Sequence, residues 1–215
     1  MLRVIGNDES LPRQEHAVAS GALTNGKAVC VNTDGTVSSV AETVNTESVS
    51  SGVVFESAST QGLAATYDTS NDKVVIVFRD SGANGQAIVG TVSGNSISFG
   101  TPVQFESGDV NNNSVVFDSS NNKVIISYVD TGNSDYGTSV VGTVSGTSIS
   151  FGTPVVYNSG GTSFVSSAFD TSANKVVIAY SESGGKAIVG TVSGTSISFG
   201  SEVQFESGGT YNTVG

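Results

Sequence analysis

Three near-identical copies of one segment restrict the possible folds of this chain more than any other feature. Residues 90–100 read GTVSGNSISFG, and residues 142–152 and 190–200 both read GTVSGTSISFG. The first residues of these segments lie 52 and 48 positions apart along the chain. A period of this length is typical of proteins in which one small unit of secondary structure stacks on the next. We therefore expect a repeat architecture.

Each repeat is expected to form four short antiparallel strands, described here for the first copy. The first strand ends in an aromatic residue followed by Asp. A polar turn leads into the second strand, 73–78, which is apolar on both faces and so belongs inside a stack of sheets. The third strand covers 87–92, and Gly94-Asn95 form a two-residue hairpin turn. The fourth strand, within 96–106, alternates apolar and polar residues, and Pro102 inside it suits an outer edge.

These patterns predict an all-β protein of tandem four-stranded antiparallel blades, as in a β-propeller, with an open stack of β-meander repeats as the alternative. A degenerate copy near the N-terminus brings the expected number to about four blades. The expected order is an N-terminal arm or partial first strand at 1–26, a degenerate blade at 27–57, three repeats at 58–107, 108–159 and 160–207, and the start of a further repeat at 208–215. That last fragment indicates either a longer array or closure by a neighbouring subunit, as in a homo-oligomer.

Charge and composition exclude several classes of partner. The net charge is −11, with only eight Lys and Arg residues, which argues against binding to nucleic acid or to anionic membrane surfaces. No apolar stretch is long enough to insert into a membrane. Cys30, the single cysteine, lies in an apolar run and is expected to be buried.

One link of the repeat varies in length, while every other internal spacing is constant. From the second-strand aromatic residue to the glycine of the third strand the step is 12, 14 and 10 residues in successive repeats. Such variation is typical of a recognition surface, although surface insertions also cost little stability. The polar residues of these loops are the candidate ligand-binding residues: Asp80, Asn84, Asp130, Asn133, Asp135, Tyr136 and Glu182.

The second of these loops also resembles part of a calcium site. Asp130, Asn133 and Asp135 provide spaced oxygen ligands around a glycine, but the distal glutamate of the EF-hand pattern is missing. A turn capped by Asp is the alternative explanation. No other cofactor is expected.

The sequence offers no recognisable catalytic constellation. His16 is the only histidine, and no Gly-x-Ser-x-Gly elbow is present. Three arginines are too few for the cluster that a sialidase-type site needs. Carboxylate pairs can hydrolyse glycosides, but Asp68, Asp118 and Asp170 recur in every repeat, as structural residues do. We expect a protein that is not an enzyme.

The blocks 169–180 and 190–200 resemble the tandem repeats of long proteins from marine tailed bacteriophages, and the stretch 19–37 resembles the segment that precedes such arrays. The resemblance implies a virion location, other virion proteins as partners, and a structural or tail-fibre-like role. Three functions remain open. The first is an adhesin that displays the variable loops to a host glycan or surface protein. The second is a purely architectural capsid or tail decoration protein, and the third is a fragment of a carbohydrate-active enzyme.

Overall fold

The computed structural model describes residues 18–23, 25–40 and 51–208, and the chain divides into two compact units, 1–49 and 50–215, each described here by itself. The described chain is all-β, and all paired strands within its sheets are antiparallel, which confirms the predicted fold class at this level. Among the described residues, no helix has the length and apolar character needed to cross a membrane.

The N-terminal unit contains one small hairpin, β1 (Val29–Val31) paired with β2 (Val37–Ser39), and a single parallel bridge from Ala19 to Val37. The expected burial of Cys30 is wrong: this residue is exposed, and its Sγ lies 3.3 Å from Ser38 Oγ, because the hairpin leaves this side of β1 uncovered. The blade expected over 27–57 falls across both units. Residues 1–17, which belong to the expected arm, and 209–215, which belong to the expected further repeat, lie outside the described residues.

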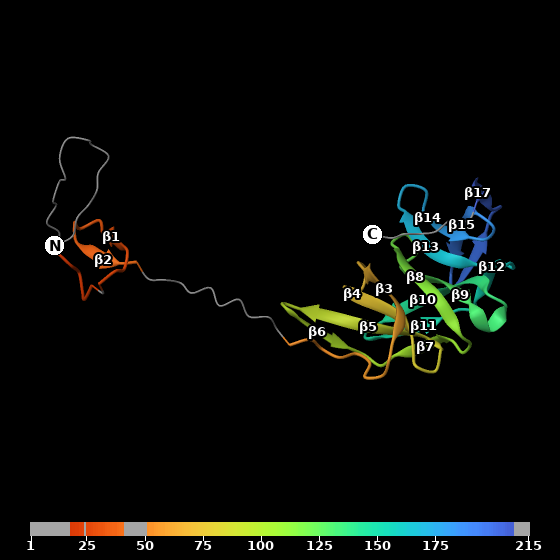
Figure 1. The fold of residues 1–215 in the computed structure, drawn as a ribbon, viewed down its shortest axis with the longest axis horizontal. Coiled ribbons are helices and arrows are strands. Elements are labelled where there is room, and N and C mark those ends of the chain that lie inside the picture. Colours follow the sequence, from red (N-terminus) through yellow and green to blue (C-terminus); the bar gives the residue numbers. More distant parts are fainter. Residues whose placement is uncertain (1–17, 24, 41–50, 209–215) are drawn as a thin grey trace. The chain divides into compact units, whose positions relative to one another are not determined.

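Residues 61–206 form three five-stranded sheets, one for each repeat, which Figure 1 shows in chain order. Sheet 1 contains β3 (Gln61–Asp68), β4 (Lys73–Arg79), β5 (Gly85–Ser93), β6 (Ser96–Phe99) and β7 (Val103–Glu106). Sheet 2 contains β8 (Val110–Asp118), β9 (Lys123–Asp130), β10 (Tyr136–Ser145), β11 (Ser148–Phe151) and β12 (Val155–Asn158). Sheet 3 contains β13 (Ser163–Asp170), β14 (Lys175–Ser181), β15 (Gly185–Ser193), β16 (Ser196–Phe199) and β17 (Val203–Glu206).

The predicted fourth strand is divided in two in every sheet, which corrects the expected four-stranded blade. In sheet 1, β6 and β7 both pair with β5, and residues 100–102 separate them. Pro102 has no N–H to donate to the ladder, and the register shifts between Gly85 and Gln86 on β5. The outer edge therefore consists of two short strands rather than one long one.

The turns follow the sequence expectations. Gly94 starts the hairpin between β5 and β6 with a φ of +57°, a conformation that glycine adopts without strain. After β3, Oδ1 of Asp68 accepts the backbone N–H groups of Ser70 and Asn71 at 2.9 and 3.0 Å. Asp118 and Asp170 hold the equivalent turns in the same way. The recurring Asp thus has a structural role in each sheet.

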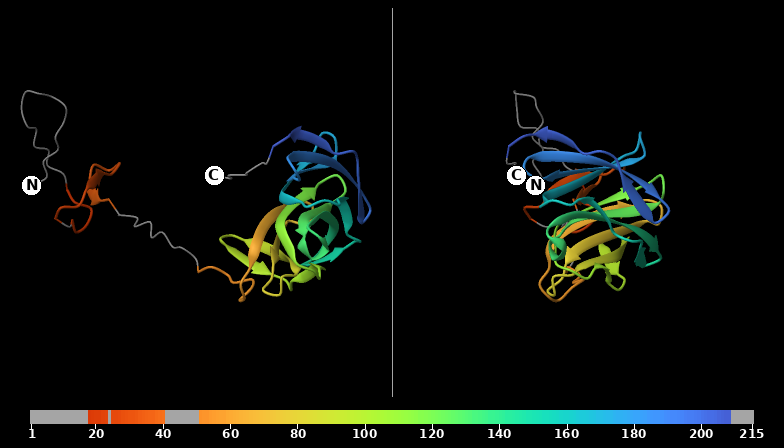
Figure 2. Two further views of the ribbon diagram at one scale, coloured as in Figure 1. Left: turned by 45° about the vertical axis from the view of Figure 1, so that its right-hand side comes forward. Right: turned by 90° about the vertical axis from the view of Figure 1, so that its right-hand side faces the viewer.

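The sheets pack face to face within residues 51–208, as the right-hand view of Figure 2 shows. Side chains alternate between the two faces of each strand. We call the face with Val124 and Ile126 the front of sheet 2 and the face with Ile125 and Val141 its back, and we use the same names for the equivalent faces of the other sheets. The front of sheet 2 packs on the back of sheet 1, and the back of sheet 2 packs on the front of sheet 3.

One aromatic residue on the back of sheet 1, and one on the back of sheet 2, enters a slot on the front of the following sheet. The Phe105 ring lies 5.3 Å from that of Tyr128 and 5.9 Å from that of Phe151. The Tyr157 ring occupies the equivalent slot of sheet 3, beside Tyr180 and Phe199. These side chains carry much of the apolar area that is buried between sheets.

Candidate functional site

The length difference between repeats lies in the links from β4 to β5, β9 to β10 and β14 to β15. These links contain residues 80–84, 131–135 and 182–184. The second includes one turn of 3-10 helix, η1 (Thr131–Asn133). The extra residues of the second repeat also extend its strands by the pair Asp130–Tyr136. The three loops therefore differ in conformation as well as in length.

The first loop is closed on itself. The carboxylate of Asp80 accepts the backbone N–H groups of Gly82 and Asn84 at 2.8 and 2.9 Å, and the side-chain amide of Gln86 at 3.0 Å. Burial alone would raise the pKa of Asp80, but these hydrogen bonds outweigh it and lower the pKa. Because the Asn84 amide also donates to Asp80, both predicted ligand residues are engaged in holding their own loop.

In the second loop, the three residues of the resembled calcium site differ in their exposure to solvent. Burial, and then the charge of Glu106, raise the pKa of Asp130. Asn133 and Asp135 are exposed, and Tyr136 is half-buried. Within the described ranges, no group of three or more His, Cys, Asp or Glu side chains is placed to hold a metal ion.

The third loop contributes Glu182 to a cavity of about 520 Å³ between sheets 2 and 3, and we name this cavity the Tyr157–Glu202 pocket. Its volume lies within the range of small-molecule sites. The pocket lining comes from the end of β12, the loop after it, β15 and the residues before β17: Tyr157, Asn158, Ser159, Gly160, Glu182, Lys186, Ile188, Gly200 and Glu202.

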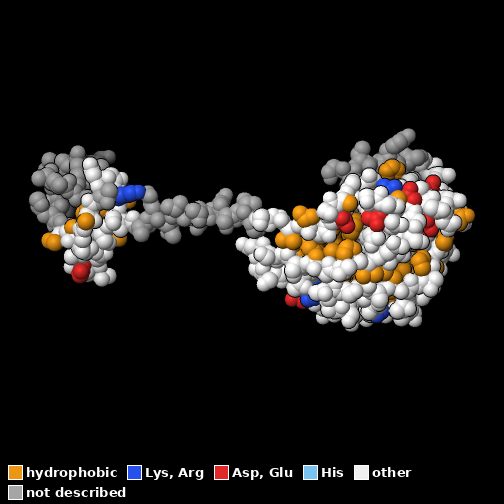
Figure 3. Space-filling view, turned by 90° about the horizontal axis from the view of Figure 1, so that it is seen from below, with side chains coloured by type: hydrophobic (Ala, Val, Ile, Leu, Met, Phe, Trp, Pro, Cys, Tyr) orange, Lys and Arg blue, Asp and Glu red, His pale blue; other side chains and the backbone are white. Residues whose placement is uncertain are grey.

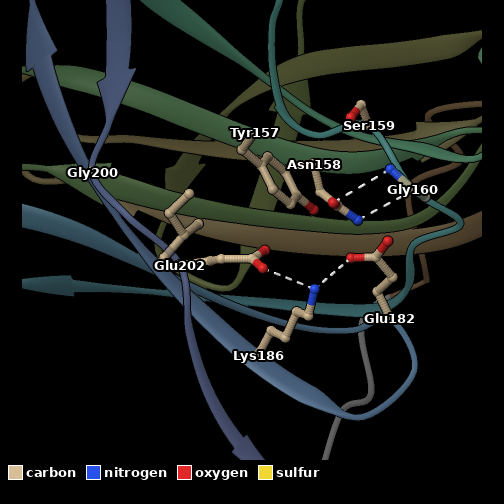
Figure 4. Close-up of a pocket in the computed structure, with 9 residues that line it drawn as sticks. Tyr157, Asn158, Ser159, Gly160, Glu182, Lys186, Gly200 and Glu202 are labelled. Atoms are coloured by element: carbon tan, nitrogen blue, oxygen red, sulfur yellow. Dashed lines mark hydrogen bonds and ion pairs between the residues drawn. The ribbon is translucent and has the colours of Figure 1, made fainter.

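An ion triad forms one wall of the pocket (Figure 4). The Lys186 ammonium donates to Glu182 Oε2 at 2.7 Å and to Glu202 Oε1 at 2.9 Å. The hydroxyl of Tyr180 donates to the second oxygen of Glu202 at 2.7 Å. Lys186, and then Tyr180, lower the pKa of Glu202, while Glu182 and then Glu202 raise the pKa of Lys186. Lys186 and Glu202 are therefore both charged at neutral pH.

Opposite the triad, Tyr157 and Asn158 supply uncharged polar groups. The hydroxyl oxygen of Tyr157 is buried and has no hydrogen-bond partner in the described structure. Burial raises the pKa of Tyr157, so the hydroxyl stays protonated and can donate. The amide of Asn158 is held by Thr162 Oγ1 at 2.8 Å, and Figure 4 shows its bonds to Gly160.

Gly160 lets the chain approach Glu182 closely. A Cβ atom at this position would lie 1.6 Å from Glu182 Oε1. At the equivalent Gly108 of sheet 1, the nearest atoms would be 3.7 Å away. The absence of a side chain at Gly160 therefore leaves the room in which the Glu182 carboxylate reaches Lys186.

Five residues of this pocket depart from their equivalents in both other repeats. Phe105 and Glu106 become Tyr157 and Asn158, and the Pro102 position becomes Glu202. Lys186 of sheet 3 is equivalent to Gln86 of sheet 1 and Thr138 of sheet 2. Glu182 is equivalent to Asp80 and Asp130. Between sheets 1 and 2 the matching acidic residue, Asp130, faces Glu106 instead of a lysine.

A second cavity, of about 440 Å³, lies where the first strands of the three sheets end. Tyr67, Phe117 and Phe169, which precede the recurring Asp, line it together with several hydroxyl side chains. None of its lining residues is charged. It therefore lacks the charged donors and acceptors that line the Tyr157–Glu202 pocket.

Of the seven predicted site residues, the structure places Glu182 alone among the residues that line this pocket. Sequence reasoning missed Tyr157, Asn158, Lys186 and Glu202, which belong to strands or to the broken outer edge rather than to a variable loop. Their signal was present as departures from the repeat, but only the packing of sheet 2 on sheet 3 brings them together.

No known protein family, curated protein or solved structure matches this chain.

Proposed function

We propose that this chain is a non-enzymatic attachment protein of a virion, which binds a neutral saccharide of the host surface in the Tyr157–Glu202 pocket. The observation that carries the proposal is the gathering of five departures from the repeat around one cavity. The other repeats form the same strands without these five residues, so the frame does not require them. The tail-fibre-like setting rests on the resemblance of the repeats to those of tailed-phage proteins.

The polar groups of the pocket suit a ligand rich in hydroxyl groups. Lys186 has three N–H groups and uses two of them in the triad, and the Tyr157 hydroxyl can donate. Carboxylate oxygens of Glu182 and Glu202 accept, so donors and acceptors alternate as neighbouring sugar hydroxyls require. Two carboxylates against one ammonium leave a net negative charge, which disfavours an anionic sugar.

The same geometry favours binding over hydrolysis. A retaining glycosidase also holds two carboxyl groups close together, but one of them needs a raised pKa to protonate the leaving group. Here Lys186, and then Tyr180, lower the pKa of Glu202. The ammonium of Lys186 also bridges the two carboxylates. These features support the prediction of a protein without catalytic activity.

We also propose that the three sheets are blades of a β-propeller-like array. The sheets pack through their faces, and β8 lies beside both β3 and β13, as the innermost strands of neighbouring blades do. An open stack of the same sheets is the alternative arrangement.

A purely architectural role is the second candidate, and one observation favours it. The first two variable loops bond to the start of the following sheet instead of projecting freely. Val110 N–H donates to the carbonyl of Ala83 at 3.2 Å, and Thr162 N–H donates to that of Asp135 at 2.8 Å. Two of the three variable loops thus help to join neighbouring sheets.

A glycan array probed with the full chain tests the proposal. We expect binding to neutral glycans, and we expect Lys186→Gln, which installs the residue of repeat 1, to weaken it at least about tenfold, since a hydrogen bond from a charged group is worth about 1.5–3 kcal/mol. Glu202→Pro, the residue of the other two repeats, should have the same effect. Gln86→Lys, the reverse change in sheet 1, is the matched control and should leave binding unchanged.

Three results would contradict the proposal of a non-enzymatic saccharide-binding protein. Glycan binding that Lys186→Gln and Glu202→Pro leave intact would place the site elsewhere. Binding to virion proteins without any glycan signal would favour the architectural role. Release of sugar from a bound polysaccharide, lost in Glu202→Pro, would instead indicate an enzyme.

A further inference from the structure

The back face of sheet 3 exposes the side chains that are buried wherever two sheets meet. On the back of sheet 1, Val89 and Phe105 are 1% and 7% exposed, whereas their equivalents Val189 and Phe205 are 45% and 64% exposed. Val203, beside Phe205, is also largely exposed. Figure 3, which views this unit from below, shows that hydrophobic side chains also form bands on that side of its surface. The back of sheet 3 therefore has the composition of an inter-sheet interface without a covering sheet in the described chain.

Within the described chain, Gly200 also lacks the neighbouring sheet that its equivalents Gly100 and Gly152 contact. A Cβ atom at Gly100 would lie 1.9 Å from the carbonyl oxygen of Thr147, and one at Gly152 would lie equally close to that of Thr195. Both glycines are thus required by the backbone of the next sheet. At Gly200 the nearest atom to an added Cβ is the Val189 carbonyl oxygen, 3.8 Å away. The third glycine has no such neighbour within the described residues, although it belongs to the same motif.

The front face of sheet 1 is the matching half. Val92 on this face is 54% exposed, whereas its equivalent Val144 in sheet 2 is 8% exposed. Tyr67 is likewise half exposed, whereas Phe117 is buried. The chain thus presents both halves of an interface that it forms twice internally. The back of sheet 3 is exposed, and the front of sheet 1 is exposed at Val92 and Tyr67, although Phe78 on the same face is buried.

The aromatic slot on the front of sheet 1 already holds Phe55. The ring of Phe55 lies 5.3 Å from that of Phe78 and 5.6 Å from that of Phe99, nearly the distances at the two inner slots. The segment 53–57 reads VVFES, and the segment 203–207 reads VQFES. Phe55 therefore occupies the place that a preceding sheet's aromatic residue would take.

We propose that the back of sheet 3 binds the front of sheet 1 in a second copy of this chain, with Phe205 of the first copy replacing Phe55 of the second. The partner is fixed by complementarity, since the two internal interfaces show which face covers which. The contact is heterologous, so it produces a ring or a filament of copies. Residues 53–57 limit this assembly, because Phe55 and Phe205 compete for one slot.

Sedimentation velocity of the full chain over a concentration series tests the proposal. Phe55→Ala vacates the slot, and we expect it to lower the dissociation constant of self-association by about tenfold or more, given the energy of burying one aromatic ring. Gly200→Ala adds a Cβ that the single chain accommodates but that would meet the partner's backbone. We expect the double variant Phe55→Ala/Gly200→Ala to be monomeric. Phe205→Ala should abolish assembly as well.

Hydrogen exchange gives a second readout, and its measurement on the wild-type chain does not depend on any variant folding. The amides of β17 should gain protection with increasing concentration, and Gly200→Ala should remove this dependence. The proposal is overturned if Phe55→Ala stays monomeric, or if larger species persist when Gly200→Ala is added. Protection of β17 that is independent of concentration would show that the chain itself covers the face, which also overturns it.

Discussion

Asp68 and Tyr157 illustrate two kinds of side chain in this protein. Asp68 recurs in each repeat, and its carboxylate accepts the N–H groups of the turn that follows. Tyr157 stands where the other repeats have Phe105 and Phe205, and its added hydroxyl is buried without a partner. A buried hydroxyl of this kind costs stability. Its presence at the pocket is understandable if a ligand supplies the missing hydrogen bond.

Replacing Tyr157 by Phe should therefore raise stability and reduce function. We expect the free energy of unfolding to increase by about 1 kcal/mol, because the change removes an unpaired polar group while keeping the ring in its slot. Urea denaturation measures this. Saccharide binding should weaken in the same variant.

Tyr128→Phe is the control for this change. The Tyr128 hydroxyl donates to Glu106 at 3.0 Å, so its removal should lower stability by about 1 kcal/mol. Equal effects of the two substitutions would contradict the assignment of Tyr157 as unpaired.

Pairs of sheets are joined where a glycine of one outer edge meets a hairpin turn of the next. Gly100, between β6 and β7, lies against Thr147 in the turn between β10 and β11. The same arrangement recurs at Gly152 and Thr195. The interruption of the outer strand by Gly-Thr-Pro therefore also provides a contact that only glycine allows.

The same substitution should have different effects at equivalent positions of the repeat. Gly100→Ala and Gly152→Ala should each lower the unfolding free energy by about 1–3 kcal/mol, because the new methyl group overlaps a backbone carbonyl of the next sheet. Gly200→Ala should change it by less than about 0.5 kcal/mol in dilute solution. Thermal or urea unfolding of the three variants compares them directly, and three equal losses would show that the strand break, not the neighbouring sheet, requires glycine.

At the scale of the whole molecule, the chain has a net charge of −11. Lys186 forms ion pairs with two of its glutamates, Glu182 and Glu202, between sheets 2 and 3. The pKa of Glu202 is below its ordinary value of 4.5, and the pKa of Lys186 is above its ordinary value of 10.5. Each group is therefore more favourable when charged in the folded chain than in the unfolded chain. Lys186 and Glu202 are both charged between these two values.

The contribution of Glu202 to stability should be constant above about pH 4.5 and should disappear as the pH falls through its folded-state pKa. That of Lys186 should be complete below about pH 10.5 and lost as the pH rises through its folded-state pKa. Unfolding of wild type and Glu202→Gln across this range checks the acid limb. A stability difference that persists in acid would contradict the ion pairing of Glu202.

The repeated strands were largely predictable, because local patterns control them. The alternation along β6 and β7, the apolar β4 and the Gly94 turn each follow from neighbouring residues. The division of the fourth strand was not predicted, although Pro102 lay inside it. It depends on the pairing of β7 with β5, where the register shifts next to Gly85. The exposure of Cys30 was also missed, since an apolar run does not reveal whether another layer covers it.

The amino-acid sequence by itself determined the all-β repeat, its turns and the constancy of its frame, since these depend on spacing within about fifty residues. Tertiary structure decided the candidate site and the uncovered faces. Tyr157 and Glu202 belong to different repeats and meet only because sheet 2 packs on sheet 3. Phe105 and Phe205 occupy equivalent positions of the same motif. Phe105 is buried because a neighbouring sheet covers it, and Phe205 is exposed because no sheet of the described chain does.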